Sequence, residues 1–435
     1  MTTPESAVSL LAFFEAHDSI QYVRCQWLDY AGILRARILT KRHCLQLARA
    51  GKPIRNGAPG LSSLPDNSVA SFTEHIYDHH ICPDWASLRP LCLGGSAPRY
   101  AMVMCYVVDP SAAPSEQHTD LCPRRALQNV LEASQTSTLG RILIGFEIEF
   151  HVLKATGADI APAIELPLGH YSAGGLRDPT FGCVEEALDN LNNSSIQFQQ
   201  FHVEGSTGQY EIVLDPLPPM QAIDELVMAQ DIIRSTFSRH GYVATMLPKP
   251  IASLDGSGSH VHISISEVEH HDCFSAGMLK HLPALCAITL PMSSSYERLK
   301  TYEAGQFVCW GTNNRLAPIR LIEKGHWEYR CADATMNYYL ALATIIAAGA
   351  SGVVNQTPLL LKDISGMEKS AIGASHMPLP LDFEASLTAL RASLSLWNEL
   401  LGSAVVQKYL RYKEHEFETM EKQDSALAQC LWKWY

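Results

Sequence analysis

The segment FHVEGSTGQYEI, residues 201–212, decides how the rest of the chain is interpreted. Polar and apolar residues alternate on both sides of a Gly-Ser-Thr-Gly turn at 205–208, a pattern that predicts two adjacent strands. Within ten positions the segment carries one histidine, two glutamates and one glutamine. A sheet that packs against a core favours apolar side chains, so carboxylates in this pattern require a specific partner or solvent.

Three further segments present the same kind of polar face. Each alternates polar residues with apolar ones, so the polar side chains of a segment share one face of a strand. The three sets are Glu147 and Glu149 in GFEIEF, His260, His262 and Ser264 in SHVHISI, and Glu328 and Arg330 in HWEYRC. A half-exposed sheet would also alternate polar and apolar residues, but its solvent-exposed face would favour Thr, Ser and Lys. A face built almost entirely of Glu, His and Arg indicates a chemical site.

Several carboxylates on one surface raise each other's pKa unless cations neutralise them. Divalent metal ions and a set of arginines or lysines are both possible counter-charges. Carboxylates with a single histidine suit Mg²⁺ or Mn²⁺ better than Zn²⁺. Four arginines also fall close together in the sequence: Arg298, Arg315, Arg320 and Arg330. Metal ions that face arginines are typical of sites that handle ATP phosphates.

The composition predicts a globular protein. The chain has 435 residues, of which 47 % are hydrophobic and 18 % charged. A net charge of −12 argues against general nucleic-acid binding, although it permits a nucleotide substrate. The 12 cysteines include no CxxC pair, which argues against a zinc ribbon or a disulfide scaffold. No window reaches the roughly 18 apolar residues of a membrane span, so we expect a cytoplasmic protein without membrane contact.

The order of the expected strands, helices and loops predicts an α+β protein with two domains. Residues 21–40 read as a hairpin, 41–50 as a helix and 100–108 as a strand. A stretch rich in Pro, Ser and Ala follows at 109–127, and beyond it strands and helices alternate until helices dominate. We therefore place one domain at residues 1–115 and a second at residues 116–435.

These motifs resemble those of the glutamine synthetase family over nearly the whole chain. The matching pieces stand in family order: LDYAGILRARIL (28–39), GFEIEF (145–150), HVEGSTGQYEI (202–212), PKPIASLDGSGSHVHISI (248–265), SSYERLKTYEAG (294–305), NNRLAPIR (313–320) and WEYRCADATMNYYL (327–340). The resemblance implies an N-terminal β-grasp domain followed by a glutamine synthetase-type catalytic domain, in which helices surround an antiparallel sheet funnel. The segment at 201–212 looks closest to the fungal-type members.

The resemblance also implies a role for each candidate residue. Two Mg²⁺ or Mn²⁺ ions per active site would be held, one by Glu149, Glu204 and Glu211, the other by Glu147, His260 and Glu328. ATP would lie along His262, Ser264, Arg315 and Arg320. Glutamate would be bound by Gly256, Arg298 and Arg330. Arg315 would also act in catalysis with Glu303, which would shield the acyl phosphate and take a proton from the amine.

The implied reaction joins glutamate to an amine. ATP phosphorylates the γ-carboxyl group, and the amine then displaces phosphate to give an amide. The family's active sites lie between the subunits of homo-oligomeric rings. One departure favours an organic amine over ammonia as the acceptor: Asn56 and Gly57 stand where the family has an aspartate that helps to bind ammonium. A second departure is Asp255, which replaces an asparagine that touches the amino-acid substrate in the family and would favour an amino group over a carboxylate. His326 stands where an arginine is common, and Tyr338 replaces a proline.

Three alternatives remain open from the sequence. The chain could be an ordinary glutamine synthetase that uses ammonia. It could be a non-catalytic relative with a scaffold or signalling role, although such a protein has no physical reason to keep a costly cluster of like charges. A phosphotransferase that stops at the acyl phosphate is a further alternative.

Overall fold

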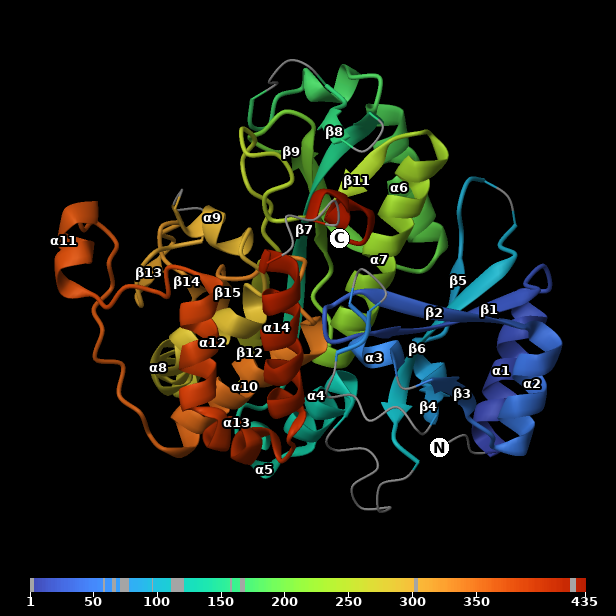
Figure 1. Cartoon of the computed structure of the whole chain (residues 1–435), viewed down its shortest axis with the longest axis horizontal. Coiled ribbons are helices and arrows are strands. Elements are labelled where there is room, and N and C mark those ends of the chain that lie inside the picture. The colour runs from blue at the N-terminus through green and yellow to red at the C-terminus, as the bar shows by residue number, and fades with distance from the viewer. Residues whose placement is uncertain are drawn as a thin grey trace.

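The computed structural model describes residues 4–57, 59–64, 68–70, 78–95, 97–110, 121–156, 159–164, 169–300, 304–422 and 428–435. The described strands form two sheets, the first from residues 22–108 and the second from residues 142–329 (Figure 1). The predicted domain boundary at 115/116 falls in 111–120, outside the described residues, so the division into two domains stays a prediction.

The first sheet is built from the N-terminal part of the chain. Its six described strands are β1 (Tyr22–Leu28), β2 (Leu34–Thr40), β3 (Ile54–Gly57), β4 (Asp78–Pro83), β5 (Arg89–Leu91) and β6 (Tyr100–Val108). They run in the order β2-β1-β6-β4-β3, and β5 pairs with β6. The predicted hairpin is confirmed as the antiparallel pair β1–β2. In its turn, the carboxylate of Asp29 accepts a hydrogen bond from the backbone N–H of Ile33 at 2.9 Å.

The second sheet carries all four of the polar faces seen in the sequence. Its strands are β7 (Ile142–Thr156), β8 (Asp159–Pro162), β9 (Phe198–Val203), β10 (Gln209–Leu214), β11 (Val243–Thr245), β12 (Val261–Ile265), β13 (Trp310–Thr312), β14 (Ile319–Glu323) and β15 (His326–Tyr329). The order is β13-β14-β15-β12-β7-β10-β9, with β8 and β11 also on β7. Strand β7 is central, because it pairs antiparallel with β10 on one edge and with β12 on the other.

Helices pack around both sheets (Figure 1). Beside the first sheet lie α1 (Pro4–Ala16), α2 (Lys41–Ala50), α3 (Pro59–Ser62) and η1 (Trp85–Ser87). The remaining helices are α4 (Pro123–Glu132), α5 (Ser134–Ser137), η2 (Gly175–Arg177), α6 (Phe181–Asn193), α7 (Pro219–Arg239), η3 (Val268–His270), α8 (His271–Thr289), α9 (Ser295–Lys300), α10 (Tyr338–Val354), α11 (Lys369–Ser375), α12 (Phe383–Ala392), α13 (Leu394–Leu401), α14 (Val405–Lys422) and η4 (Ala428–Lys433). Mixed helices and sheets confirm the α+β class.

Helix α10 lies at the centre of the core. Fifteen of its residues are buried. It packs tightly against α8 because two glycines let the backbones approach: a Cβ at Gly277 would lie 2.2 Å from the carbonyl oxygen of Ala348. Within the described residues, no helix is long and apolar enough to cross a membrane.

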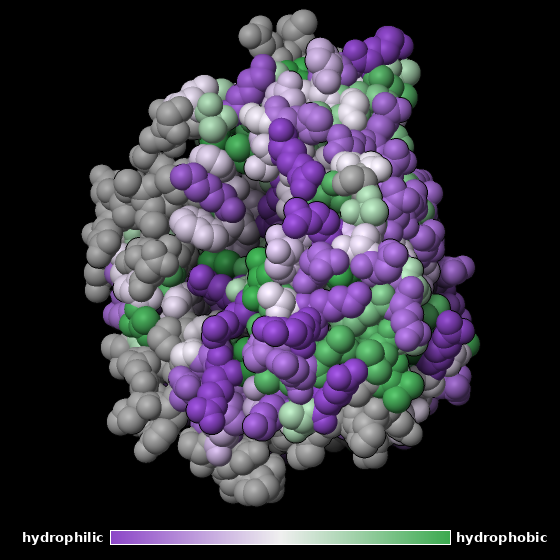
Figure 2. All heavy atoms as spheres, turned by 90° about the vertical axis from the view of Figure 1, so that its right-hand side faces the viewer, coloured by the Kyte–Doolittle hydropathy of each residue, from purple (hydrophilic) through white to green (hydrophobic). Residues whose placement is uncertain are grey.

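Direct contacts tie the N-terminal hairpin to the rest of the chain. The hydroxyl of Tyr435 donates to the carbonyl of Ala31 at 2.7 Å, and the side chain of Asn337 donates to the carbonyl of Asp29 at 2.8 Å. Arg24 forms an ion pair of 2.9 Å with Asp231 on α7. The face of the molecule at the right-hand side of Figure 1 is mostly hydrophilic, with apolar residues in scattered patches (Figure 2). These contacts hold the hairpin against α7, Asn337 and Tyr435.

Candidate active site

Strands β7, β9 and β10, together with residues that directly flank β12 and β15, line one cavity of about 650 Å³. The predicted site residues that line it are Glu147, Glu149, Glu204, Glu211, Gly256, His260, Arg298, Arg315 and Arg330. Glu328 lies directly behind them, in contact with His260. The structure therefore brings together side chains from segments that are up to about 180 residues apart in the sequence, since Glu147 and Glu328 share the site.

Three predicted residues lie beside this cavity rather than on its wall. The Nε2 atom of His262 lies 3.2 Å from Oε1 of Glu147, which is on the wall. Arg320 donates a hydrogen bond to Glu328, which lies beside the wall. Ser264 is half-buried on the same face of β12, two residues farther along the strand. The predicted catalytic residue Glu303 falls in 301–303, outside the described residues.

The first candidate metal group consists of Glu147, His260 and Glu328. One ligand atom from each lies within 4.8 Å of the others. The Nδ1 atom of His260 lies 2.7 Å from Oε2 of Glu147 and 3.3 Å from Oε1 of Glu328. The other ring nitrogen of His260 is buried and has no hydrogen-bond partner among the described residues. An imidazole between two carboxylates fits a divalent cation such as Mn²⁺.

A second group contains a residue that sequence reasoning did not assign. His202, Glu204 and Glu211 also offer ligand atoms within 4.8 Å of one another. The Nε2 atom of His202 lies 3.2 Å from Oε1 of Glu211, and its Nδ1 atom lies 3.7 Å from Oε1 of Glu204. The signal was present in the sequence, since His202 stands two positions before Glu204 in an alternating strand.

Glu149 is placed by strand register. Residues Glu211 and Glu149 are direct partners across β10 and β7, so their side chains are neighbours on one face. A third group joins Glu149 to Glu147 and Glu211. The second carboxylate oxygen of Glu149 accepts a hydrogen bond of 2.8 Å from the backbone N–H of Gly258. The two candidate metal groups are thus linked through one pair of facing carboxylates.

The electrostatics of the cavity show a shortage of positive charge. Burial, and then the negative charges of Glu147, Glu149 and other neighbouring carboxylates, raise the pKa of Glu211 to about 10. Burial opposes ionisation of Glu147 as well, but hydrogen bonds with His260 and His262 outweigh it and hold the pKa of Glu147 well below its usual value. A dication at the site would offset both the burial and the repulsion, and would favour the ionised form of Glu211.

The arginines are held in place by Glu328 and by the backbone. Arg320 donates to one carboxylate oxygen of Glu328 at 2.9 Å, and Arg330 donates to the other. Arg298 is buried and donates to the carbonyl of Ala332 at 2.9 Å. Burial opposes ionisation of Glu328, but the charges of His260 and Arg330 outweigh it and lower its pKa. Arg315 is exposed on the wall of the cavity.

The loop at 255–258 packs its backbone against the metal groups. The side chain of Gln209 donates to the carbonyl of Gly256 at 3.0 Å, which fixes the loop over β10. At Gly258 there is no room for a side chain: a Cβ would lie 2.6 Å from Nη2 of Arg298 and 2.8 Å from Nε2 of His260. The glycine therefore permits a close approach between the loop, a candidate metal ligand and a candidate substrate-binding arginine.

Residues that depart from the family pattern also lie here. The Nδ1 atom of His262 lies 3.0 Å from Nε2 of His326. Asp255 is exposed on the cavity wall, which also includes His170 and Tyr171. The Nδ1 atom of His170 lies 3.3 Å from Oε2 of Glu204. One wall of the cavity thus carries carboxylates and rings near the candidate metal groups.

Comparison with known proteins agrees with this geometry. A family model described as "Glutamine synthetase, catalytic domain" matches residues 120–431. The chain belongs to the glutamine synthetase family. Solved structures of similar fold include the "GmaS/ADP complex-Conformation 1", with a TM-score of 0.80 over 98 % of both chains and 23 % identity. The predicted glutamine synthetase fold is confirmed, whereas the β-grasp assignment of the N-terminal sheet stays a prediction.

Relatives within the glutamine synthetase family differ in name and length. "Protein fluG" of Emericella nidulans is 32 % identical over 95 % of this chain and 48 % of its own length. This chain therefore spans about half the length of that curated relative. "Gamma-glutamylpolyamine synthetase GlnA3" of Streptomyces coelicolor is 27 % identical over 63 % of this chain and 68 % of its own length. A "Glutamine synthetase" of Thermococcus kodakarensis is 31 % identical over 68 % of this chain and 70 % of its own length.

Proposed function

We propose that the protein is an ATP-dependent ligase that forms an amide between the γ-carboxyl group of glutamate and an amine, through a γ-glutamyl phosphate. The observation that carries this proposal is the convergence of carboxylates, His260 and arginines on one cavity in a member of the glutamine synthetase family. Phosphoryl transfer depends mainly on positioning and charge neutralisation, and this cavity offers side chains for both.

The donor set fits two Mg²⁺ or Mn²⁺ ions. Glu147, His260 and Glu328 would hold one ion, and Glu149, Glu204 and Glu211 the other, with His202 beside them. The raised pKa of Glu211 and the unpartnered ring nitrogen of His260 support this fit. When bound, such ions would neutralise phosphate oxygens and the charge that develops during transfer.

The remaining side chains have separate tasks. Arg298 and Arg330, with the backbone of Gly256, would bind glutamate, because guanidinium groups make forked hydrogen bonds to carboxylates. ATP would lie along His262, Ser264, Arg315 and Arg320, and Arg315 would steady the transferring phosphate. Glu303 would accept the proton of the incoming amine. The anion Asp255 would favour a positively charged amino group over a carboxylate at its position on the wall.

An organic amine is the acceptor that we favour. None of the described residues in 4–110 lines the cavity, so a neighbouring copy in a homo-oligomeric ring would complete it. The loop that it would supply has Asn56 and Gly57 in place of an ammonium-binding aspartate. The name of the Streptomyces relative, a γ-glutamylpolyamine synthetase, supports the same class of acceptor. Ammonia is the alternative, as in the relatives named glutamine synthetase.

The test is a product assay with the full chain. The purified protein is incubated with ATP, Mg²⁺, glutamate and either ammonium or one of methylamine, ethanolamine and putrescine. Phosphate release and product mass are measured, and a Glu211→Ala variant serves as the inactive control. We expect a γ-glutamyl amide from at least one organic amine at a lower concentration than ammonium requires. Efficient use of ammonium would replace this proposal by glutamine synthesis, and a lack of both turnover and Mn²⁺ binding would favour a scaffold.

A further inference from the structure

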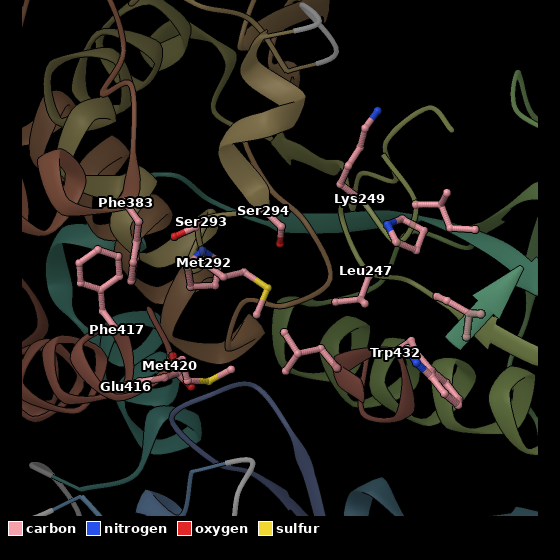
Figure 3. A pocket seen from close by; sticks show the side chains of 15 residues that line it. Leu247, Lys249, Met292, Ser293, Ser294, Phe383, Glu416, Phe417, Met420 and Trp432 are labelled. Atoms are coloured by element: carbon pink, nitrogen blue, oxygen red, sulfur yellow. The ribbon is translucent and has the colours of Figure 1, made fainter. Parts of the chain in front are cut away.

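A second cavity lies apart from the candidate active site. It has a volume of about 540 Å³ and, among the described residues, shares no lining residue with the first cavity. Its walls come from β8, the loop 247–251 after β11, the segment 291–294 between α8 and α9, and the helices α12, α14 and η4 (Figure 3). Six segments of the chain thus enclose a volume within the range of small-molecule sites.

The lining of this second cavity is mainly apolar and aromatic. Phe383 and Phe417 form an edge-to-face pair, with ring centroids 5.8 Å apart, at one end of the cavity. Trp432 lies at the opposite end, and Met292 and Met420 lie between them (Figure 3). Aromatic rings at both ends favour a planar apolar ligand, and methionine side chains adapt their shape to such a ligand.

The polar groups of the cavity restrict the ligand further. The indole N–H of Trp432 is buried and has no hydrogen-bond acceptor among the described residues, while the residue as a whole is only 9 % exposed. A buried donor without an acceptor is costly, so an acceptor supplied by a ligand would be favoured. This orphan donor sits on the wall of a cavity that has room for such a ligand.

The two charged residues of the lining already have partners. The carboxylate of Glu416 accepts hydrogen bonds from Lys413 at 2.6 Å and from the hydroxyl of Tyr412 at 3.3 Å. Lys249 donates to the carbonyl of Leu254, and in Figure 3 its amino end points away from the other labelled side chains. A charged ligand would lose hydration without gaining a free counter-ion, so a neutral ligand is favoured.

We propose that this cavity is a binding site for a neutral, largely aromatic small molecule whose oxygen accepts a hydrogen bond from Trp432. The site is placed to influence the active site through the chain itself. The loop 247–251 leads into Asp255 and Gly256, and the segment 291–294 leads into α9, which carries Arg298. A ligand that orders both segments would change the affinity for glutamate, a consequence that rests on the proposed ligase function.

The test uses the neutral naphthalene ketone dye prodan, whose fluorescence rises in apolar surroundings. We expect saturable binding to the full chain at one site, with a dissociation constant on the order of 10 µM. Met420→Trp would fill the cavity and abolish binding, whereas Met377→Trp, at a position that is 57 % exposed and outside the lining, would leave binding unchanged. Trp432→Phe keeps an aromatic wall but removes the donor, and would weaken binding about fivefold.

The outcomes separate this inference from the proposed function. Dye binding that Met420→Trp abolishes, in a protein that makes no amide, would support the cavity and contradict the ligase. Binding that survives Met420→Trp while the variant unfolds at the parent's temperature would overturn the proposal, as would equal affinity of parent and Trp432→Phe. Binding that appears only in dissociated subunits would also overturn it, because a second copy would then occupy the cavity. A shift in the glutamate KM at saturating dye, with unchanged Mn²⁺ affinity, is the expected sign of coupling.

Discussion

Replacement of Gly258 by alanine should damage the metal site without unfolding the protein. The added Cβ would lie 2.6 Å from Nη2 of Arg298, 2.8 Å from Nε2 of His260 and 3.1 Å from Oε1 of Glu149. Ordinary contacts begin near 3.4 Å, so the arginine and the imidazole must each move by about 0.6–0.8 Å. Displacements of this size in groups that position metal ligands typically cost about 10- to 100-fold in metal affinity.

The assay is a Mn²⁺ titration followed by electron paramagnetic resonance, which counts free ions and needs no turnover. Gly182→Ala is the matched control, because a Cβ at this position on α6 would meet nothing within 4 Å. We expect the parent and Gly182→Ala to bind Mn²⁺ equally and Gly258→Ala to bind at least about tenfold more weakly. Thermal unfolding should leave both variants folded at the temperature of the assay. Parental Mn²⁺ affinity in Gly258→Ala would refute the placement of this glycine beside a metal ligand.

Three further predictions concern charge. Because the pKa of Glu211 is about 10, Mn²⁺ binding at pH 7 should release close to one proton. The measured binding enthalpy should then depend on the ionisation heat of the buffer, and the Glu211→Gln variant should lose that dependence. Equal binding enthalpies for the parent in all buffers would contradict this prediction. Burial raises the pKa of Asp29 from 3.8 to about 6, so its carboxyl destabilises the fold as pH rises through 4 to 6. Relative to Asp29→Asn, the parent should lose up to about 3 kcal/mol of unfolding free energy between pH 4 and pH 7, measured by denaturant unfolding. A difference in unfolding free energy that does not change with pH would argue against this assignment. Asp255→Asn should raise the KM for glutamate about tenfold and leave Mn²⁺ affinity unchanged, whereas an unaltered KM would remove Asp255 from substrate recognition.

Local patterns predicted the strands and their polar faces. Alternation alone placed Glu147 and Glu149 on one side of a strand, and the structure has them on β7. Local patterns also predicted the hairpin of residues 21–40 and the helix of residues 41–50. These features depend on residues close in sequence, where the period of a strand or helix fixes which side chains share a face.

Contacts between distant segments could not be predicted in the same way. The partnership of Glu211 with Glu149 depends on the register of β10 against β7, and the approach of His202 to Glu211 depends on the register of β10 against β9. The tight fit at Gly258 appears only once the loop meets Arg298. The second cavity, around Met292 and Trp432, could not be predicted from the sequence either, because its walls come from six separate segments.

The most direct measurement is anomalous diffraction at the manganese edge from crystals of the protein soaked in Mn²⁺. Two separate peaks should appear in each active-site cavity, one bounded by Glu147, His260 and Glu328, and one beside Glu204 and Glu211. A cavity with one peak or none, at Mn²⁺ concentrations that saturate binding in solution, would contradict a two-ion ligase site.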